Sequence, residues 1–181
     1  MHVRTGVGAS WVDPARHEEE DDWRRFYQCA RIIQQGIHTL CPPTAIPSSR
    51  QQSLLDIYVA SDNSKTKEKM QEWDAEDCRQ QSNTVSTTTV RSAPHLEAFH
   101  IDRSQKERMR DPAAADLDLW GELSTLTDAV CLVTSRSGFS DLPTWLSPQQ
   151  PRCQVQFDSC SPEKVTIALQ ALCNAGCPVY D

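Results

Sequence analysis

An arginine stands near the beginning of the sequence, in the segment Arg4-Thr5-Gly6-Val7-Gly8. Its planar guanidinium matches a pyrophosphate, to which it can donate two parallel hydrogen bonds, and it does not lose its charge by deprotonation. The small residues after Arg4 would let a ligand approach the backbone closely. Arg4 is therefore a candidate phosphate-binding residue, and the alternative from chemistry alone is a solvated arginine on the surface.

The second candidate is a serine-rich turn that separates an apolar run from a helix-like run. Its residues include Ser135, Ser137, Gly138, Phe139 and Ser140. Hydroxyl groups and free backbone N–H groups at the start of a helix form a site for an anion. Serine and glycine are also common in ordinary turns, so both interpretations stay open.

Two weaker candidates carry a carboxylate. Ser61-Asp62-Asn63 can contact a ligand, although a helix cap is the favoured interpretation of these residue types. Asp102, within His100-Ile101-Asp102-Arg103, can accept hydrogen bonds from the N1–H and 2-amino groups of a guanine. The alternative for Asp102 is an ion pair on the surface.

Other patterns limit the chemistry. The acidic run Glu18 to Asp22 predicts a solvated helix start rather than a metal site, and the five histidines show no ligand spacing. The sequence contains no G-x-x-x-x-G-K-[ST] phosphate loop and no G-x-G-x-x-G dinucleotide motif. We therefore expect no metal and no cofactor. The net charge of −7 argues against a nucleic-acid partner.

The sequence holds eight cysteines. Cys173 and Cys177 are the favoured disulfide candidates, whereas Cys29 and Cys131 lie in apolar segments and are expected to be buried thiols. No apolar run approaches the roughly 20 residues that cross a bilayer, and the first residues show no secretory signal. The absence of C-x-x-C argues against structural zinc.

Strand-like and helix-like segments alternate along the chain, which predicts one α/β domain over residues 1–181. We expect a three-layer Rossmann-like domain with a mainly parallel sheet, in which ligands bind at the carboxyl ends of the strands. The expected strands cover residues 2–4, 54–60, 87–90, 130–134 and 153–157. The expected helices cover residues 21–37, about 63–73, 112–126, the segment after 140, and 162–172. Gly36 should help to end the first helix, and residues 74–83 should form a loop.

The order of these motifs resembles that of the inverting GT-B fucosyltransferases that use GDP-fucose, a group with α1,6, α1,2 and protein O-fucosyltransferases. The matching segments span roughly residues 1–146 and are His2-Val3-Arg4-Thr5-Gly6, Phe26-Tyr27-Gln28-Cys29-Ala30, Ile57-Tyr58-Val59-Ala60-Ser61-Asp62 and Val133-Thr134-Ser135-Arg136-Ser137-Gly138-Phe139-Ser140. The resemblance implies the C-terminal, donor-binding half of the GT-B fold, without the N-terminal acceptor domain. It also implies a glycan or protein acceptor and a Golgi or endoplasmic reticulum location.

The resemblance further implies roles for single residues. Arg4 would contact the β-phosphate of GDP-fucose and stabilise the leaving group, and His2 would shape the same pocket. Asp102 would contact the guanine. Ser137, Phe139 and Ser140 of the serine-rich turn would line the phosphate and fucose site, and Ser135 and Gly138 of the same turn would also be substrate-binding residues. Thr5-Gly6 stands where many relatives have a second arginine and an acid, which leaves the catalytic base unassigned. The alternative is a degenerate nucleotide-binding module without catalysis.

Overall fold

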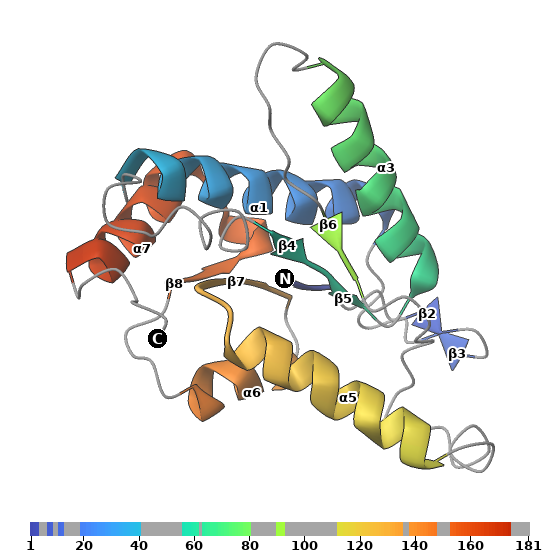
Figure 1. Ribbon diagram of the computed structural model, residues 1–181. Helices are drawn as coiled ribbons and strands as arrows, with labels where there is room; N and C mark the ends of the chain where they lie inside the picture. Colours follow the sequence, from blue (N-terminus) through green and yellow to red (C-terminus); the bar gives the residue numbers. More distant parts are fainter. Residues whose placement is uncertain are drawn as a thin grey trace.

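The computed structural model describes residues 1–3, 7–8, 11–12, 19–40, 56–61, 63–80, 90–92, 112–135, 138–147 and 153–174. Most of these residues are helical, and helices alternate with short strands (Figure 1). The helices are α1 (Glu20–Leu40), α3 (Ser64–Gln80), α5 (Pro112–Thr127), α6 (Gly138–Leu146), α7 (Pro162–Asn174) and the 3-10 turn η3 (Phe157–Ser159). The strands are β1 (His2–Val3), β2 (Val7–Gly8), β3 (Trp11–Val12), β4 (Ile57–Tyr58), β5 (Ala60–Ser61), β6 (Val90–Arg91), β7 (Cys131–Thr134) and β8 (Cys153–Gln156).

Three of the strand pairs are parallel: β1 with β5, β4 with β6, and β7 with β8. Only β2 and β3 pair in the antiparallel sense among the described strands. The backbone N–H of Val59 donates to Arg91 O at 2.8 Å, and that of Ala60 donates to Met1 O at 2.9 Å, which joins β6, the β4–β5 segment and β1 into one row. Strand β1 also contacts β7, which runs beside it in the same direction (Figure 1). The expectation of an α/β chain with parallel strands is confirmed at this level.

Helices cover both faces of this row of strands. Helices α1 and α7 lie on one side with α3 next to α1, and α5 and α6 lie on the other side (Figure 1). Ile57 and Val59 belong to the larger apolar cluster, with residues of α1, α3 and α7, whereas Tyr58 and Ala60 belong to a smaller cluster with Leu126 of α5. Successive side chains of a strand point to opposite faces, so this alternation is what a sheet covered on both sides requires.

Helix α1 forms the main cover of the larger cluster. The acidic side chains in its first turn interact favourably with the positive end of the helix dipole. The backbone N–H of Glu19 donates to Asp22 Oδ2 at 3.4 Å. The helix continues to Leu40, so the expectation that Gly36 helps to end it is wrong. A Cβ atom at Gly36 would lie 2.5 Å from Leu169 Cδ1, which shows that the glycine lets α7 pack closely against α1.

Helix α3 begins as expected and ends later than expected. Asn63 caps its start, because Asn63 Oδ1 accepts the backbone N–H of Lys65 at 2.9 Å. The expected loop at residues 74–83 is wrong for residues 74–80, which continue the helix to Gln80. Polar composition suggested a loop there, but Asp74 and Asp77 have partners on α1 that hold this half of the helix in place.

Two disulfides join the described part of the chain. Cys29 of α1 pairs with Cys160, with their Cα atoms 5.9 Å apart, and Cys131 of β7 pairs with its register partner Cys153 of β8, at 4.4 Å. The expectation of buried thiols at Cys29 and Cys131 is therefore wrong, since an apolar sequence context indicates burial and does not exclude a sulfur partner. The expected Cys173–Cys177 pair lies outside the described side chains.

Candidate functional site

The carboxyl ends of β1, β5 and β7 form the edge at which a ligand site is expected. Because these strands are neighbours and run in the same direction, the residues that follow them begin at one edge of the sheet. His2 lies in β1, and Ser135 follows β7 and is buried. Gly138, Phe139 and Ser140 are the first three residues of α6, and only the backbone of these three residues is described.

Three predicted site residues, Arg4, Asp102 and Ser137, lie outside the described residues. Arg4 directly follows β1 in the sequence, and Ser137 directly precedes α6. The structure therefore brings together the strand ends that precede Arg4 and the serine-rich turn. The contacts of those two groups with each other remain a prediction.

Buried hydroxyl groups occur at this edge on two strands and one helix. Ser61 ends β5, and its Oγ accepts the backbone N–H of Asn63 at 3.2 Å. Thr134 ends β7, and Thr66 lies in the first turn of α3. Both threonines are almost completely buried, with exposed fractions of 1% and 0%, and neither Oγ1 atom has a hydrogen-bond partner. Sequence patterns did not identify Thr66, and they did not assign a role to Thr134 within the segment from Val133 to Ser140.

An ion pair between α3 and α5 is also buried. Lys67 Nζ lies 2.9 Å from Glu122 Oε1, and the two side chains are only 6% and 8% exposed. A buried charge is tolerated when an opposite charge contacts it directly. This ion pair therefore connects the first turn of α3 to the middle of α5. Its residues are 55 positions apart in the sequence, and no local spacing signals their contact.

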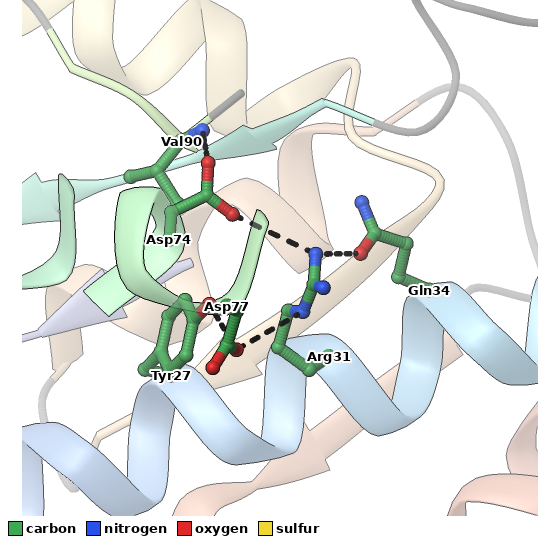
Figure 2. Close-up of polar contacts among 6 residues, drawn as sticks. All are labelled: Tyr27, Arg31, Gln34, Asp74, Asp77 and Val90. Carbon is green, nitrogen blue, oxygen red and sulfur yellow. Dashed lines mark hydrogen bonds and ion pairs between the residues drawn. The ribbon is translucent and has the colours of Figure 1, made fainter. Parts of the chain in front are cut away.

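Among the described residues, an extensive polar cluster lies between α1 and α3, centred on the buried guanidinium of Arg31 (Figure 2). Arg31 Nη1 lies 3.6 Å from Asp74 Oδ1, and Arg31 Nε lies 3.8 Å from Asp77 Oδ2. On the other side Arg31 Nη1 donates to Gln34 Oε1 at 2.8 Å. The hydroxyl of Tyr27 donates to Asp77 Oδ2 at 2.7 Å. Both carboxylates are thus held by groups of the protein itself.

Burial shifts the pKa of two groups in this cluster. It raises the pKa of the Tyr27 hydroxyl, assisted by the hydrogen bond to Asp77, so Tyr27 remains a neutral donor. Burial also raises the pKa of Asp74, although the backbone N–H of Val90 and the charge of Arg31 act in the opposite direction. The cluster therefore serves as a cross-link between α1, α3 and β6.

The spacing of the residues in this cluster is helical, although their polar composition is also typical of a loop. Tyr27, Arg31 and Gln34 are spaced four and three residues apart, which places them on one face of a helix. Asp74 and Asp77 are spaced three apart, which is typical of one helical face as well. The helix expected over about residues 63–73 stopped before Asp74 and Asp77, because residues 74–83 were expected to form a loop.

Within the described ranges, no group of three or more His, Cys, Asp or Glu side chains is arranged to hold a metal ion. The helices described for this chain include none with the length and apolar character needed to cross a membrane. Comparison with known proteins gives no matching family model, no matching curated protein and no matching solved structure.

Proposed function

We propose that this chain is the donor-binding domain of a GDP-fucose-dependent glycosyltransferase, with a three-layer Rossmann-like fold of the GT-B type. One observation carries the proposal beyond the sequence motifs. Strands β1 and β7, which precede Arg4 and the serine-rich turn, are neighbours that end at the same edge. A diphosphate at that edge can be reached from both segments, as in open α/β sheets generally.

The proposed reaction transfers fucose to a glycan or protein hydroxyl with inversion at the anomeric carbon. The acceptor oxygen forms a bond to that carbon while the bond to the β-phosphate oxygen breaks, and GDP leaves with the bonding electrons. The proton of the acceptor passes to a base that is not assigned here. Arg4 and the N–H groups at the start of α6 would stabilise the negative charge that develops on the leaving diphosphate.

The disulfides support a location in the secretory pathway. Cys29–Cys160 and Cys131–Cys153 would form and persist in an oxidising compartment, whereas cytosolic thiols are usually kept reduced. The Golgi or endoplasmic reticulum, where donors and acceptors of glycosylation meet, is the proposed location.

The alternative is a module that binds the nucleotide without catalysis. Thr5-Gly6, at the place where many fucosyltransferases carry a second arginine and an acid, favours this alternative. A form of the protein that includes an acceptor domain distinguishes the two. Fucose transfer supports the enzyme, and GDP binding without transfer supports the module.

Calorimetric titration of the chain with GDP tests the proposal directly. Arg4→Ala should weaken GDP binding by about ten- to hundredfold, since a hydrogen bond to a charged group contributes roughly 1.5–3 kcal/mol. Arg79→Ala is the matched control. Arg79 is exposed in the last turn of α3, at the end far from the strand edge, so its loss should leave the affinity unchanged. Absence of GDP binding by the wild type would contradict the proposal, as would equal affinities of the Arg4 and Arg79 variants.

A further inference from the structure

Thr134 carries a hydroxyl that the described protein leaves without a hydrogen bond. The side chain is 1% exposed, and Oγ1 has no partner. Four threonines in the helices solve this problem locally, because each donates to the carbonyl four residues earlier: Thr39, Thr125, Thr127 and Thr166. Thr134 belongs to a strand, where no such carbonyl is available, and a buried hydroxyl without a partner is costly.

The position of Thr134 relates its hydroxyl to the start of α6. Side chains alternate along β7, so Thr134 lies on the same face as Leu132, which packs with Leu126 of α5. Helix α6 packs against α5 on this side of the strands and begins at Gly138, four residues after Thr134 (Figure 1). The hydroxyl and the beginning of α6 are thus found at the same end of β7 and on the same face.

The groups at this end of β7 are suited to an anion. A helix of nine residues, such as α6, has first N–H groups that lack partners within the helix, and its positive end attracts negative charge. The Thr134 hydroxyl adds a further donor. Asp141, the acid in the first turn of α6, is exposed to solvent. A phosphate group, which has several acceptor oxygens, can accept hydrogen bonds from all of these donors.

We infer that Thr134 is a ligand-binding residue whose hydroxyl donates a hydrogen bond to a phosphate oxygen of a diphosphate bound at the start of α6. This inference rests on the proposed function and adds a residue to that site. It assigns to Thr134 the recognition of the diphosphate rather than of the base, because the donors around it are those of a helix start. No bond is made or broken by Thr134 itself.

The test compares Thr134→Val, which removes the hydroxyl and keeps the shape, with Thr127→Val as the matched control. Calorimetric titrations use GDP and guanosine, and urea denaturation measures the stability of each variant. Thr134→Val should weaken GDP binding by about ten- to hundredfold, leave guanosine binding unchanged, and leave the protein as stable as the wild type or more stable. Thr127→Val should leave GDP binding unchanged and lower the stability, because the Thr127 hydroxyl donates to Leu123 O at 2.8 Å.

The two claims fail in different ways. If the wild type binds GDP and Thr134→Val binds it equally well, the role of Thr134 is wrong and the proposed function stands. Reduced stability of Thr134→Val would overturn the inference too, because it would show that the hydroxyl has a partner within the protein. If the wild type does not bind GDP at all, the proposed function is wrong, and the inference falls with it.

Discussion

Removal of the Cys29–Cys160 disulfide should destabilise the chain more than removal of Cys131–Cys153. The two cysteines of the first bond are 131 positions apart, and those of the second are 22 apart. In the chain-entropy relation, which depends on the logarithm of loop length, these separations correspond to about 5 and about 3.4 kcal/mol at 25 °C. The expected difference between the two losses is therefore about 1.6 kcal/mol.

The two pairs are well matched for this comparison. Each contains one completely buried sulfur residue, Cys29 or Cys153, and one of intermediate exposure, Cys160 or Cys131. The double variants Cys29→Ala/Cys160→Ala and Cys131→Ala/Cys153→Ala thus create similar cavities and differ mainly in loop length. Urea denaturation followed by tryptophan fluorescence gives the free energy of unfolding for each. A domain of this size is stable by about 5–15 kcal/mol, so the first double variant should lose a large part of its stability.

The order of the two losses decides the reasoning. Equal losses, or a larger loss for Cys131→Ala/Cys153→Ala, would show that loop closure in the unfolded chain does not govern the effect. Addition of a reductant to the wild type should lower its stability by more than either double variant loses, since it opens both bonds. An unchanged midpoint on reduction would refute the presence of stabilising disulfides altogether.

Three further perturbations test other contacts. Lys67→Met should lower the free energy of unfolding by about 3–5 kcal/mol, because it removes the opposite charge beside the buried Glu122 carboxylate. Combining Lys67→Met with Glu122→Leu should restore most of the lost stability, as measured by urea denaturation. The raised pKa of Asp74 means that the folded state holds the proton of this carboxyl more tightly than the unfolded state does. The contribution of Asp74 to the free energy of unfolding is therefore most favourable below the unfolded pKa of 3.8, and it is lost as the pH rises through the folded pKa. Asp74→Asn should remove this pH dependence when stability is measured against pH. Gly121→Ala, on an exposed helical surface with open space, should stabilise the protein by about 0.5–1 kcal/mol in thermal denaturation. The change in stability for Gly36→Ala should be less favourable than that for Gly121→Ala by about 1–3 kcal/mol, because the new methyl group meets Leu169 of α7.

The sequence predicts the helices that carry a clear apolar face. In α1, the spacing of Phe26 and Ile33 indicates the buried side, and in α7 the start is marked by Ser161, whose Oγ accepts the backbone N–H of Lys164 at 3.3 Å. Strand β7 is predicted from its short apolar run. These elements are predictable because their local pattern and their tertiary environment agree.

The second half of α3 and both disulfides could not be predicted in the same way. Asp74 and Asp77 favour a loop when only their polarity is considered, and their helix depends on Arg31 of a distant element. The partner of a cysteine depends on which segments meet in the folded chain, which spacing alone does not determine. Local sequence therefore predicts less wherever the stabilising partner lies on another element.

The location of the candidate site could be predicted from the sequence better than the side chains that form it. Strand–helix alternation predicts that ligands bind at the strand ends, where Ser61 and Ser135 lie. The importance of Thr134 depends on whether its hydroxyl finds a partner after folding, and no sequence pattern reports that. Lys67 and Glu122 likewise become neighbours only through the packing of α3 and α5.

The carboxylate of Asp74 has a consequence for how molecules of this protein meet one another. Its Oδ2 atom accepts the backbone N–H of Val90 at 3.1 Å, on the side of β6 opposite to β4, where an incoming chain would form its first hydrogen bond. A foreign strand approaching there must displace a buried side chain rather than water. Negative charge beside that position opposes an approaching carbonyl oxygen as well. Among the described strands β6 pairs with β4 alone, and the cross-link between α1, α3 and β6 should thereby discourage edge-to-edge aggregation at the other side of β6.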